Sequence, residues 1–324
     1  PTRRSSDLAK ATPVVTAPVA KASLIYNTSA LALADEGSTT GGTMQYSLDN
    51  ISWSNDIPSG TNAGDYTVYY KVVGNSNYND VAAQSIFVSI ANADMSDITA
   101  DGYNRVFDNQ AHTISVNIPE GASVKYGTAD GTYELDDAPQ YTNVGTYKVY
   151  YKVEKANYNA VTGSADVVIT AKDISNTEIT LGEALTYTGS ELTRDFTVAL
   201  LDGIEIDYTV SGNTGTDAGV YTLTISGQGN FTGSKSVSWS IGKASQPAPE
   251  TPVAVNETIK AKADGKITGV TSDMEYKLEG ASEYIAISET EIVNLAAGTY
   301  LVRYKENANF LAGADKQLII ADGA

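Results

Sequence analysis

Apolar and polar positions alternate along this chain in many short runs, and polar or glycine-containing segments separate these runs. In the run Ser85–Ile90, for example, every second residue is a large apolar one. A period of two is typical of β-strands that bury one face. No long stretch carries apolar residues at helical spacing. The pattern therefore predicts an all-β protein.

One strand pattern occurs four times. It consists of a small residue, a glycine, any residue and a tyrosine, followed by alternating apolar positions. The glycines are Gly64, Gly145, Gly219 and Gly298, and the tyrosines are Tyr66, Tyr147, Tyr221 and Tyr300. Each copy is followed by an Asn–aromatic pair and then a closing strand, and these pairs are Asn77–Tyr78, Asn157–Tyr158, Asn230–Phe231 and Asn309–Phe310. Two marks in the same order four times predict four tandem modules of about 80 residues, each ending in a β-hairpin.

Polar or proline-bearing links between the hairpins mark the module boundaries. They place module 1 at 9–93, module 2 at 94–171, module 3 at 172–243 and module 4 at 244–324. We expect each module to be a small immunoglobulin-like β-sandwich, and a β-grasp-like small β module is the alternative. The first two links are short, which predicts limited bending. The third is longer and rich in proline, as in a semi-extended spacer.

The four glycines and tyrosines are predicted to have structural roles at a corner between two strands. Glycine permits a positive φ or a close approach there. The tyrosine ring can be buried between the sheets while its hydroxyl group binds upstream backbone, as in the tyrosine corner of immunoglobulin-type domains. We therefore expect all four tyrosines to be largely buried. Asn62, Asn143 and Asp217 precede the small residue and can close the turn through their own side chains, whereas the fourth copy has Ala296.

Composition agrees with this class. The chain has 21 Tyr but only 5 Phe and 2 Trp, and its 28 Gly supply turns. The net charge of −18 disfavours nucleic acid or an anionic membrane surface as a partner. Cysteine is absent, which excludes disulfides and thiol chemistry and fits many extracellular proteins of Gram-positive bacteria, but also many cytosolic proteins. No apolar run is long enough for membrane insertion.

The repeats resemble the MBG and YDG-type modules of bacterial adhesins and surface proteins. The Ala-Gly-x-Tyr strand followed by Asn-Tyr carries this resemblance. The segment Val106–His112 is similar to the Tyr-Asp-Gly-x-Ala-His opening of the YDG type, from which it departs at Phe107 and Asn109, and Leu185–Ser190 is similar to the MBG type. Module 4 is the most divergent. The resemblance implies a secreted or cell-surface setting and spacer or adhesive modules without catalytic residues.

The sequence predicts neither catalytic nor metal-binding chemistry. His112 is the only histidine, and its place in a YDG-like opening favours a role in a turn. The carboxylate groupings Asp35–Glu36, Asp136–Asp137 and Asp49 with Asp56 lack the spacing of a known calcium loop. A paired-carboxylate glycosidase is an alternative that the unshared positions of these acids oppose. We therefore predict no enzyme activity, no cofactor and no metal.

Three hypotheses about function follow. The first is a non-catalytic stalk that projects other domains of a bacterial surface protein. The second is an adhesive module that binds a glycan or a host protein, with the segment from Tyr133 to Tyr141 as the nearest candidate. The third is a set of accessory modules of a secreted glycan-active enzyme. The first eight residues, Pro1–Leu8, resemble a translated sequencing adapter rather than native protein; a natural polar tail is the alternative.

Overall fold

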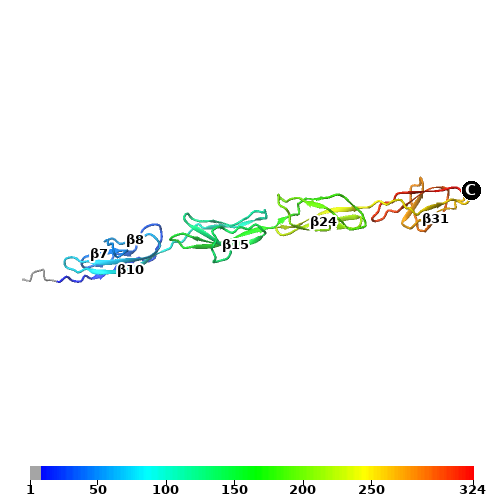
Figure 1. Cartoon of the computed structure of the whole chain (residues 1–324). Coiled ribbons are helices and arrows are strands. Elements are labelled where there is room, and N and C mark those ends of the chain that lie inside the picture. The colour runs from blue at the N-terminus through cyan, green and yellow to red at the C-terminus, as the bar shows by residue number, and fades with distance from the viewer. Residues whose placement is uncertain (1–8) are drawn as a thin grey trace, which may run out of the picture. The chain divides into compact units, whose positions relative to one another are not determined.

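The computed structural model describes residues 9–324, and the interpretation of Pro1–Leu8 lies outside these residues. No residue from 9 to 324 is helical, and every regular element is a strand (Figure 1). Within that range, accordingly, nothing forms a helix able to cross a lipid bilayer. The all-β prediction is confirmed, and a tandem array of immunoglobulin-like sandwiches replaces the β-grasp alternative, whose helix would have to lie within these residues.

The chain divides into two compact units. The first contains modules 1 and 2 as far as Thr170, except for Val106–Asn109. The second contains Ala171–Ala324 together with Val106–Asn109. Each unit therefore holds two consecutive modules. The exact boundaries between modules stay predictions.

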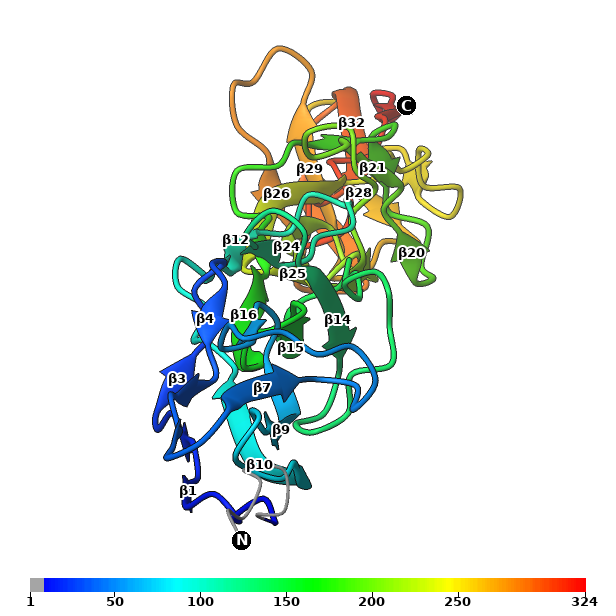
Figure 2. The same cartoon turned by 90° about the vertical axis from the view of Figure 1, so that its left-hand side faces the viewer.

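Module 1 is organised around a four-stranded sheet with the order β3-β10-β9-β7 (Figure 2). The long antiparallel hairpin of β9 and β10 is its centre, and β3 lies parallel to β10. Two-stranded ladders pair β1 with β6, β2 with β5 and β4 with β8. The strands are β1 Val15–Thr16, β2 Val19–Ala20, β3 Leu24–Ile25, β4 Leu31–Ala32, β5 Ala34–Asp35, β6 Ser38–Thr39, β7 Thr43–Ser47, β8 Ser59–Gly60, β9 Gly64–Val73 and β10 Val81–Ala91.

Modules 2 and 3 repeat this sheet, with the orders β12-β16-β15-β14 and β19-β26-β24-β22. The strands of module 2 are β11 Thr99–Asp101, β12 Tyr103–Val106, β13 Ser115–Asn117, β14 Ser123–Gly127, β15 Gly145–Glu154 and β16 Val161–Thr170. Those of module 3 are β17 Lys172–Asp173, β18 Ile179–Leu181, β19 Leu185–Thr186, β20 Leu192–Thr193, β21 Phe196–Val198, β22 Tyr208–Ser211, β23 Thr214–Gly215, β24 Gly219–Gly227, β25 Phe231–Thr232 and β26 Ser234–Gly242. The predicted closing hairpin is present in both.

Module 4 keeps the closing hairpin but arranges its sheets differently. A four-stranded sheet with the order β30-β29-β32-β33 faces a three-stranded sheet, β27-β28-β31, across one core. The strands are β27 Val253–Val255, β28 Gly265–Thr268, β29 Met274–Leu278, β30 Ile285–Ala286, β31 Glu291–Leu295, β32 Gly298–Tyr304 and β33 Lys316–Ile320. Its divergence in sequence is thus matched by a different set of strand neighbours.

Alternation along the hairpin strands builds each core. In β9 the side chains of Val68, Tyr70 and Val72 point inward and are buried, while the residues between them are more exposed. They pack with Leu33 and Ile90, which are also buried. Because side chains alternate across a pleated strand, one face of the hairpin is fixed against the core. The register also places all four corner tyrosines at equivalent points, opposite Val88, Val167, Trp239 and Leu318.

Candidate functional site

The four corner tyrosines make the same hydrogen bond. In each, the hydroxyl group donates to the backbone carbonyl oxygen of the residue four positions earlier. The acceptors and distances are Asn62 at 2.7 Å, Asn143 at 3.2 Å, Asp217 at 2.8 Å and Ala296 at 3.1 Å. We call the five-residue segments from these acceptors to the tyrosines the exit corners, because they lie at the end of the hairpin where the chain leaves its module.

Three of the four corner tyrosines are less buried than the fourth, Tyr300. Tyr300 is 6% exposed, but Tyr66, Tyr147 and Tyr221 are only half-buried. Their rings lie at the margin of the sandwich: Tyr147 stacks on Tyr141 with centroids 4.0 Å apart, and Tyr221 stacks on Trp239 at 4.7 Å. Rings at a margin cover the core on one side and face outward on the other.

The four corner positions do not require glycine for the same conformational reason. Gly64 has φ of 139°, in the region that L side chains rarely adopt. The other three have no positive φ. A Cβ would come within 3.0 Å of Leu278 at Gly298, whereas at Gly219 it would meet nothing within 4 Å. A positive φ is therefore needed only in module 1.

The Asn–aromatic pairs lie at the opposite end of each hairpin, where the chain enters the module. The N–H of Ala93 donates to the carbonyl oxygen of Asn157 at 3.0 Å, and the N–H of Asn159 donates to Ala93 at 2.8 Å. In module 4, Ala244 is held by Asn309 and Leu311 in the same way, at 3.0 and 2.8 Å. We call the four Asn–aromatic pairs the entry turns.

In the first unit, the entry turn of module 2 binds the exit corner of module 1. The Oδ1 atom of Asn157 accepts a hydrogen bond from the N–H of Ala63 at 2.9 Å. Its Nδ2 atom donates to Oδ1 of Asn62 at 3.2 Å. Beside these bonds, the ring of Tyr158 meets the ring of Tyr26 edge-on, with centroids 5.4 Å apart and planes at 79°. The side-chain amide of Asn157 thus binds both the backbone and a side chain of the neighbouring module.

In the second unit, module 4 binds module 3 through the equivalent atoms. The Oδ1 atom of Asn309 accepts from the N–H of Ala218 at 2.8 Å, and its Nδ2 atom donates to Oδ1 of Asp217 at 2.9 Å. The rings of Phe310 and Tyr187 meet edge-on at 5.2 Å and 81°. We call this set of two hydrogen bonds and one ring contact the corner–turn contact. The side chains of Asn62 and Asp217 therefore bind the next module rather than closing their own turns.

The aromatic residue that receives the entry turn also has a fixed place. The N–H of Tyr26 donates to Ala91 at 3.0 Å, and that of Tyr187 donates to Gly242 at 2.9 Å. Each acceptor is the last residue of the closing strand of its module. Phe107 is a further aromatic residue in contact with an entry turn, since its ring meets Phe231 edge-on at 5.6 Å within the second unit.

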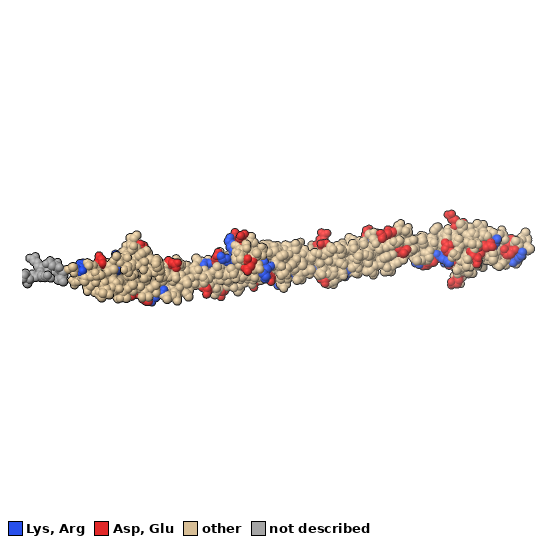
Figure 3. Space-filling model, turned by 90° about the horizontal axis from the view of Figure 1, so that it is seen from below, with Lys and Arg blue, Asp and Glu red and all other residues tan. Residues whose placement is uncertain are grey.

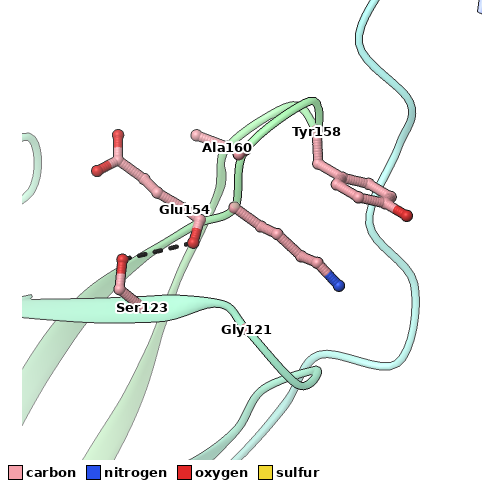
Figure 4. Close-up of a pocket in the computed structure, with 7 residues that line it drawn as sticks. Gly121, Ser123, Glu154, Tyr158 and Ala160 are labelled. Atoms are coloured by element: carbon pink, nitrogen blue, oxygen red, sulfur yellow. Dashed lines mark hydrogen bonds between the residues drawn. The ribbon is translucent and has the colours of Figure 1, made fainter. Parts of the chain in front are cut away.

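An open hollow of about 370 Å³ lies beside the entry turn of module 2 (Figure 4). On one side the hydroxyl group of Ser123 donates to the carbonyl oxygen of Glu154 at 3.4 Å. On the other side the Lys155 ammonium lies 5.0 Å from the centre of the Tyr158 ring, within range of a cation–π interaction. The Lys155 side chain therefore lies against the ring of the entry turn.

The acidic residues that could serve as metal ligands bind neighbouring groups of their own module instead. Asp136 pairs with Lys125 at 2.5 Å. Asp49 accepts hydrogen bonds from the N–H groups of Ser52 and Ile51, and these bonds hold the pKa of its carboxyl group far below the usual range. Over residues 9–324, no three acidic, histidine or cysteine side chains gather as a metal site would require. Acidic side chains are instead scattered over the visible face (Figure 3).

The predicted aromatic segment of module 2 does not form a joint surface cluster. Tyr133 donates to Asp130 at 3.3 Å, whereas the ring of Tyr141 stacks on Tyr147. The backbone of Tyr141 exchanges two hydrogen bonds with His112, at 2.8 and 2.9 Å.

No protein-family model matches the sequence, and no curated protein matches it. Solved structures of β-domain arrays do match. The eight N-terminal immunoglobulin domains of Down syndrome cell adhesion molecule are 14% identical with a TM-score of 0.28, covering 96% of this chain and 49% of that one. This chain therefore spans about half of that structure's length. Three immunoglobulin domains of titin are 13% identical with a TM-score of 0.29, covering 70% and 98%.

A third match is the Bacteroides ovatus protein SGBP-B of a mixed-linkage glucan utilization locus, in complex with a heptasaccharide. It is 14% identical with a TM-score of 0.16, and the match covers 72% of this chain and 69% of that one. At such identities and TM-scores, these likenesses carry nothing about ligand or activity.

Proposed function

We propose that the chain is a series of non-catalytic spacer modules, of the MBG and YDG type, in a bacterial secreted or cell-surface protein, where it projects other domains. The observation that supports this most is the corner–turn contact, which recurs with the same atoms in both units. A spacer has to fix each module relative to the next, and a contact that repeats in register does so without any ligand.

The energetics of this contact suit neighbours joined by a short link. A net hydrogen bond contributes about 1 kcal/mol and an edge-on ring pair about 0.5–1.5 kcal/mol, so the contact is too weak to hold two separate proteins together. A short link raises the effective concentration of the two surfaces to about the millimolar range. Together with the two backbone hydrogen bonds that hold Ala93 of the link to Asn157 and Asn159, the contact restrains the motion of one module on the next. The contact is therefore one between modules of a single chain.

The proposal is tested by measuring distances between two spin labels on adjacent modules. The chain has no native cysteine, so Ser85→Cys and Ser164→Cys, both at exposed strand positions of the first unit, can be labelled cleanly. We expect a narrow distance distribution. Substitution of both Asn157 and Tyr158 by alanine should broaden it, while a pair within module 1, at Thr43 and Ser85, should stay narrow. A broad distribution in the unsubstituted chain would contradict the spacer function.

Adhesion is a second candidate, and one observation favours it. Phe87 is 77% exposed on the outer face of β10 and borders a shallow hollow with Asp65, Thr67 and Ser89. A flat apolar ring surrounded by hydrogen-bonding groups is a suitable platform for a sugar ring. A glycan array probed with the chain and with Phe87→Ala tests this candidate. If Phe87→Ala left the glycan signals unchanged, the Phe87 ring would have no part in binding.

A further inference from the structure

The entry turn of module 1 has the same hydrogen bonds as the entry turn of module 4, which binds a corner. The N–H of Ala11 donates to the carbonyl oxygen of Asn77 at 2.9 Å, as Ala244 does to Asn309. The turn is closed by a side chain in both: the N–H of Asn77 donates to Oδ1 of Asn75 at 2.9 Å, and that of Asn309 donates to Oδ1 of Asn307 at 2.9 Å. The conformation that presents the asparagine is therefore already formed in module 1.

This turn nevertheless has no corner to bind among the residues that the structure describes. Asn77 is exposed, and its side-chain amide makes no hydrogen bond to any residue from 9 to 324. The ring of Tyr78 lies over Gly41, where a Cβ would come within 2.3 Å of it, and meets no other aromatic ring in that range. Both halves of the corner–turn contact are thus presented without a partner.

The exit end of module 4 differs from those of modules 1 and 3 at every position that the contact uses. Glu257 replaces the receiving aromatic residue, since its N–H donates to Ala321 just as that of Tyr26 donates to Ala91. Ala296 replaces the asparagine or aspartate of the corner and offers no side-chain acceptor. The N–H of Ala297, equivalent to that of Ala63, donates to Oε1 of Glu257 at 3.2 Å within the same module.

We propose that the entry turn Asn77–Tyr78 is a docking surface for the exit corner of a further module of this kind, and that the exit end of module 4 is closed to such docking. The occupant is defined by chemistry: an Asx-Ala-Gly-x-Tyr corner with an unpaired N–H at its alanine, beside an aromatic residue in the place of Tyr26. This inference rests on the corner–turn contact that also supports the proposed function.

A second copy of this chain is a poor occupant. The corners of modules 1 and 3 are bound by Asn157 and Asn309, and Glu257 closes the corner of module 4. In the corner of module 2, Asn143 and Val144 also have interaction partners. The added module must therefore bring a corner that nothing else occupies, as a copy of module 3 without module 4 would through Asp217 and Tyr187.

The test joins an extra module to the full chain in place of residues 1–9. A copy of residues 172–242 is fused to Lys10, so that its last residue, Gly242, precedes Lys10 and Ala11 as it naturally precedes Lys243 and Ala244. The matched control is a copy of residues 244–321, because Ala321 is the equivalent last residue. Spin labels go on Ser85→Cys in module 1 and on one exposed strand position of the added copy, Ser238→Cys or Gln317→Cys, which are equivalent to each other in modules 3 and 4.

We expect a narrow distance distribution with the module 3 copy, loss of the narrow peak on Asn77→Ala, and no narrow peak with the module 4 copy. A broad distribution with the module 3 copy, while the pair at Ser85 and Ser164 stays narrow, would overturn this inference and leave the proposed function standing. If both pairs were broad, the proposed function would fail as well. An equally narrow distribution with the module 4 copy would overturn the proposal that the exit end of module 4 is closed to docking.

Two further measurements serve as controls for this test. Calorimetry shows whether the added copy folds, and a copy of residues 10–91, with the corner of Asn62 and Tyr26, replaces it if it does not. Sedimentation of the unextended chain should give a monomer. A dimer that Asn77→Ala abolishes would mean that a second copy occupies the turn, contrary to the proposal.

Discussion

The Oδ1 atom of Asn157 accepts a hydrogen bond from the backbone N–H of Ala63, 94 residues earlier in the chain. This bond joins the two marks that recur through the sequence, but it joins the asparagine of one repeat to the corner of the repeat before it. Asn309 and Ala218 form the same bond in the second unit. The repeated marks therefore serve the junctions between modules as well as the modules themselves.

Asn157→Ala should loosen the junction without unfolding either module. The substitution removes both hydrogen bonds of the amide but leaves the cores of modules 1 and 2 intact. We expect the thermal transitions of the two modules to change by less than about 1 kcal/mol in stability, since the bonds lie at an end of each domain. Calorimetry checks this, with Asn77→Ala as the substitution at an entry turn without a partner. Asn157→Gly is a second variant that removes the same amide and tolerates the positive φ of 70° at this position. A loss of several kcal/mol would instead assign Asn157 to the core of module 2.

The corner tyrosines should differ in their contribution to stability according to their burial. Tyr300→Ala should destabilise module 4 by about 3–5 kcal/mol, as is usual for truncation of a buried aromatic ring. Tyr221 is half-buried, so Tyr221→Ala should cost about 2 kcal/mol in module 3. The control Tyr221→Phe removes only the hydrogen bond to Asp217 and should cost about 1 kcal/mol. Equal costs for the two alanine variants would mean that ring burial does not set the contribution.

Glu257 should be essential to module 4. Glu257 is 5% exposed, and its carboxylate accepts hydrogen bonds from the N–H groups of Ala261, Ala263 and Ala297, at 3.1, 2.8 and 3.2 Å. Glu257→Ala leaves these donors without an acceptor and should lower the stability of module 4 by about 3 kcal/mol. Glu289→Ala, at an exposed position of the same module, should have little effect in the same thermal scan. An unchanged transition in Glu257→Ala would contradict the closed corner.

Module 4 should also lose stability at low pH through Asp264. Hydrogen bonds from the hydroxyl and N–H groups of Thr258, with Lys262 nearby, lower the pKa of this carboxyl group from 3.8 to about 2. Because the folded state favours the charged form, the contribution is present above about pH 4 and is lost as the pH falls towards about 2. The melting temperature of the unsubstituted module should therefore fall more steeply over this range than that of Asp264→Asn. If the melting temperatures of the two proteins fell in parallel with pH, the assignment of this loss of stability to Asp264 would be contradicted.

Much of the fold could be predicted from the sequence, because strands and hairpins are local. The alternation in Ser85–Ile90 and the repeated Gly-x-Tyr pattern are enough to place the closing hairpin and to align the four corners. The degree of ring burial was not predictable in the same way. It depends on Tyr141 and Trp239, whose stacking on the corner tyrosines is a matter of tertiary packing.

The junction was harder to predict, for a physical reason. The sequence shows that Asn157 follows Tyr147 at a nearly constant distance, which suggests that both act within one hairpin. That hairpin is long enough to place them at opposite ends of the module, so each meets a neighbour instead. Comparison of the four copies would have singled out Glu257 and Ala296 as departures. Only the structure shows that the carboxylate of Glu257 accepts the hydrogen bond of the Ala297 N–H, in the place of an asparagine from another module.

Hydrogen exchange at the backbone amide of Ala63 tests the central claim most directly. The claim predicts that this N–H is protected in the full chain by a residue of the next module. Asn157→Ala should then raise its exchange rate about fivefold, the factor for a hydrogen bond worth about 1 kcal/mol. Asn77→Ala should leave the rate unchanged. An Ala63 amide that exchanges equally fast with and without the Asn157 side chain would contradict the corner–turn contact and the junction built on it.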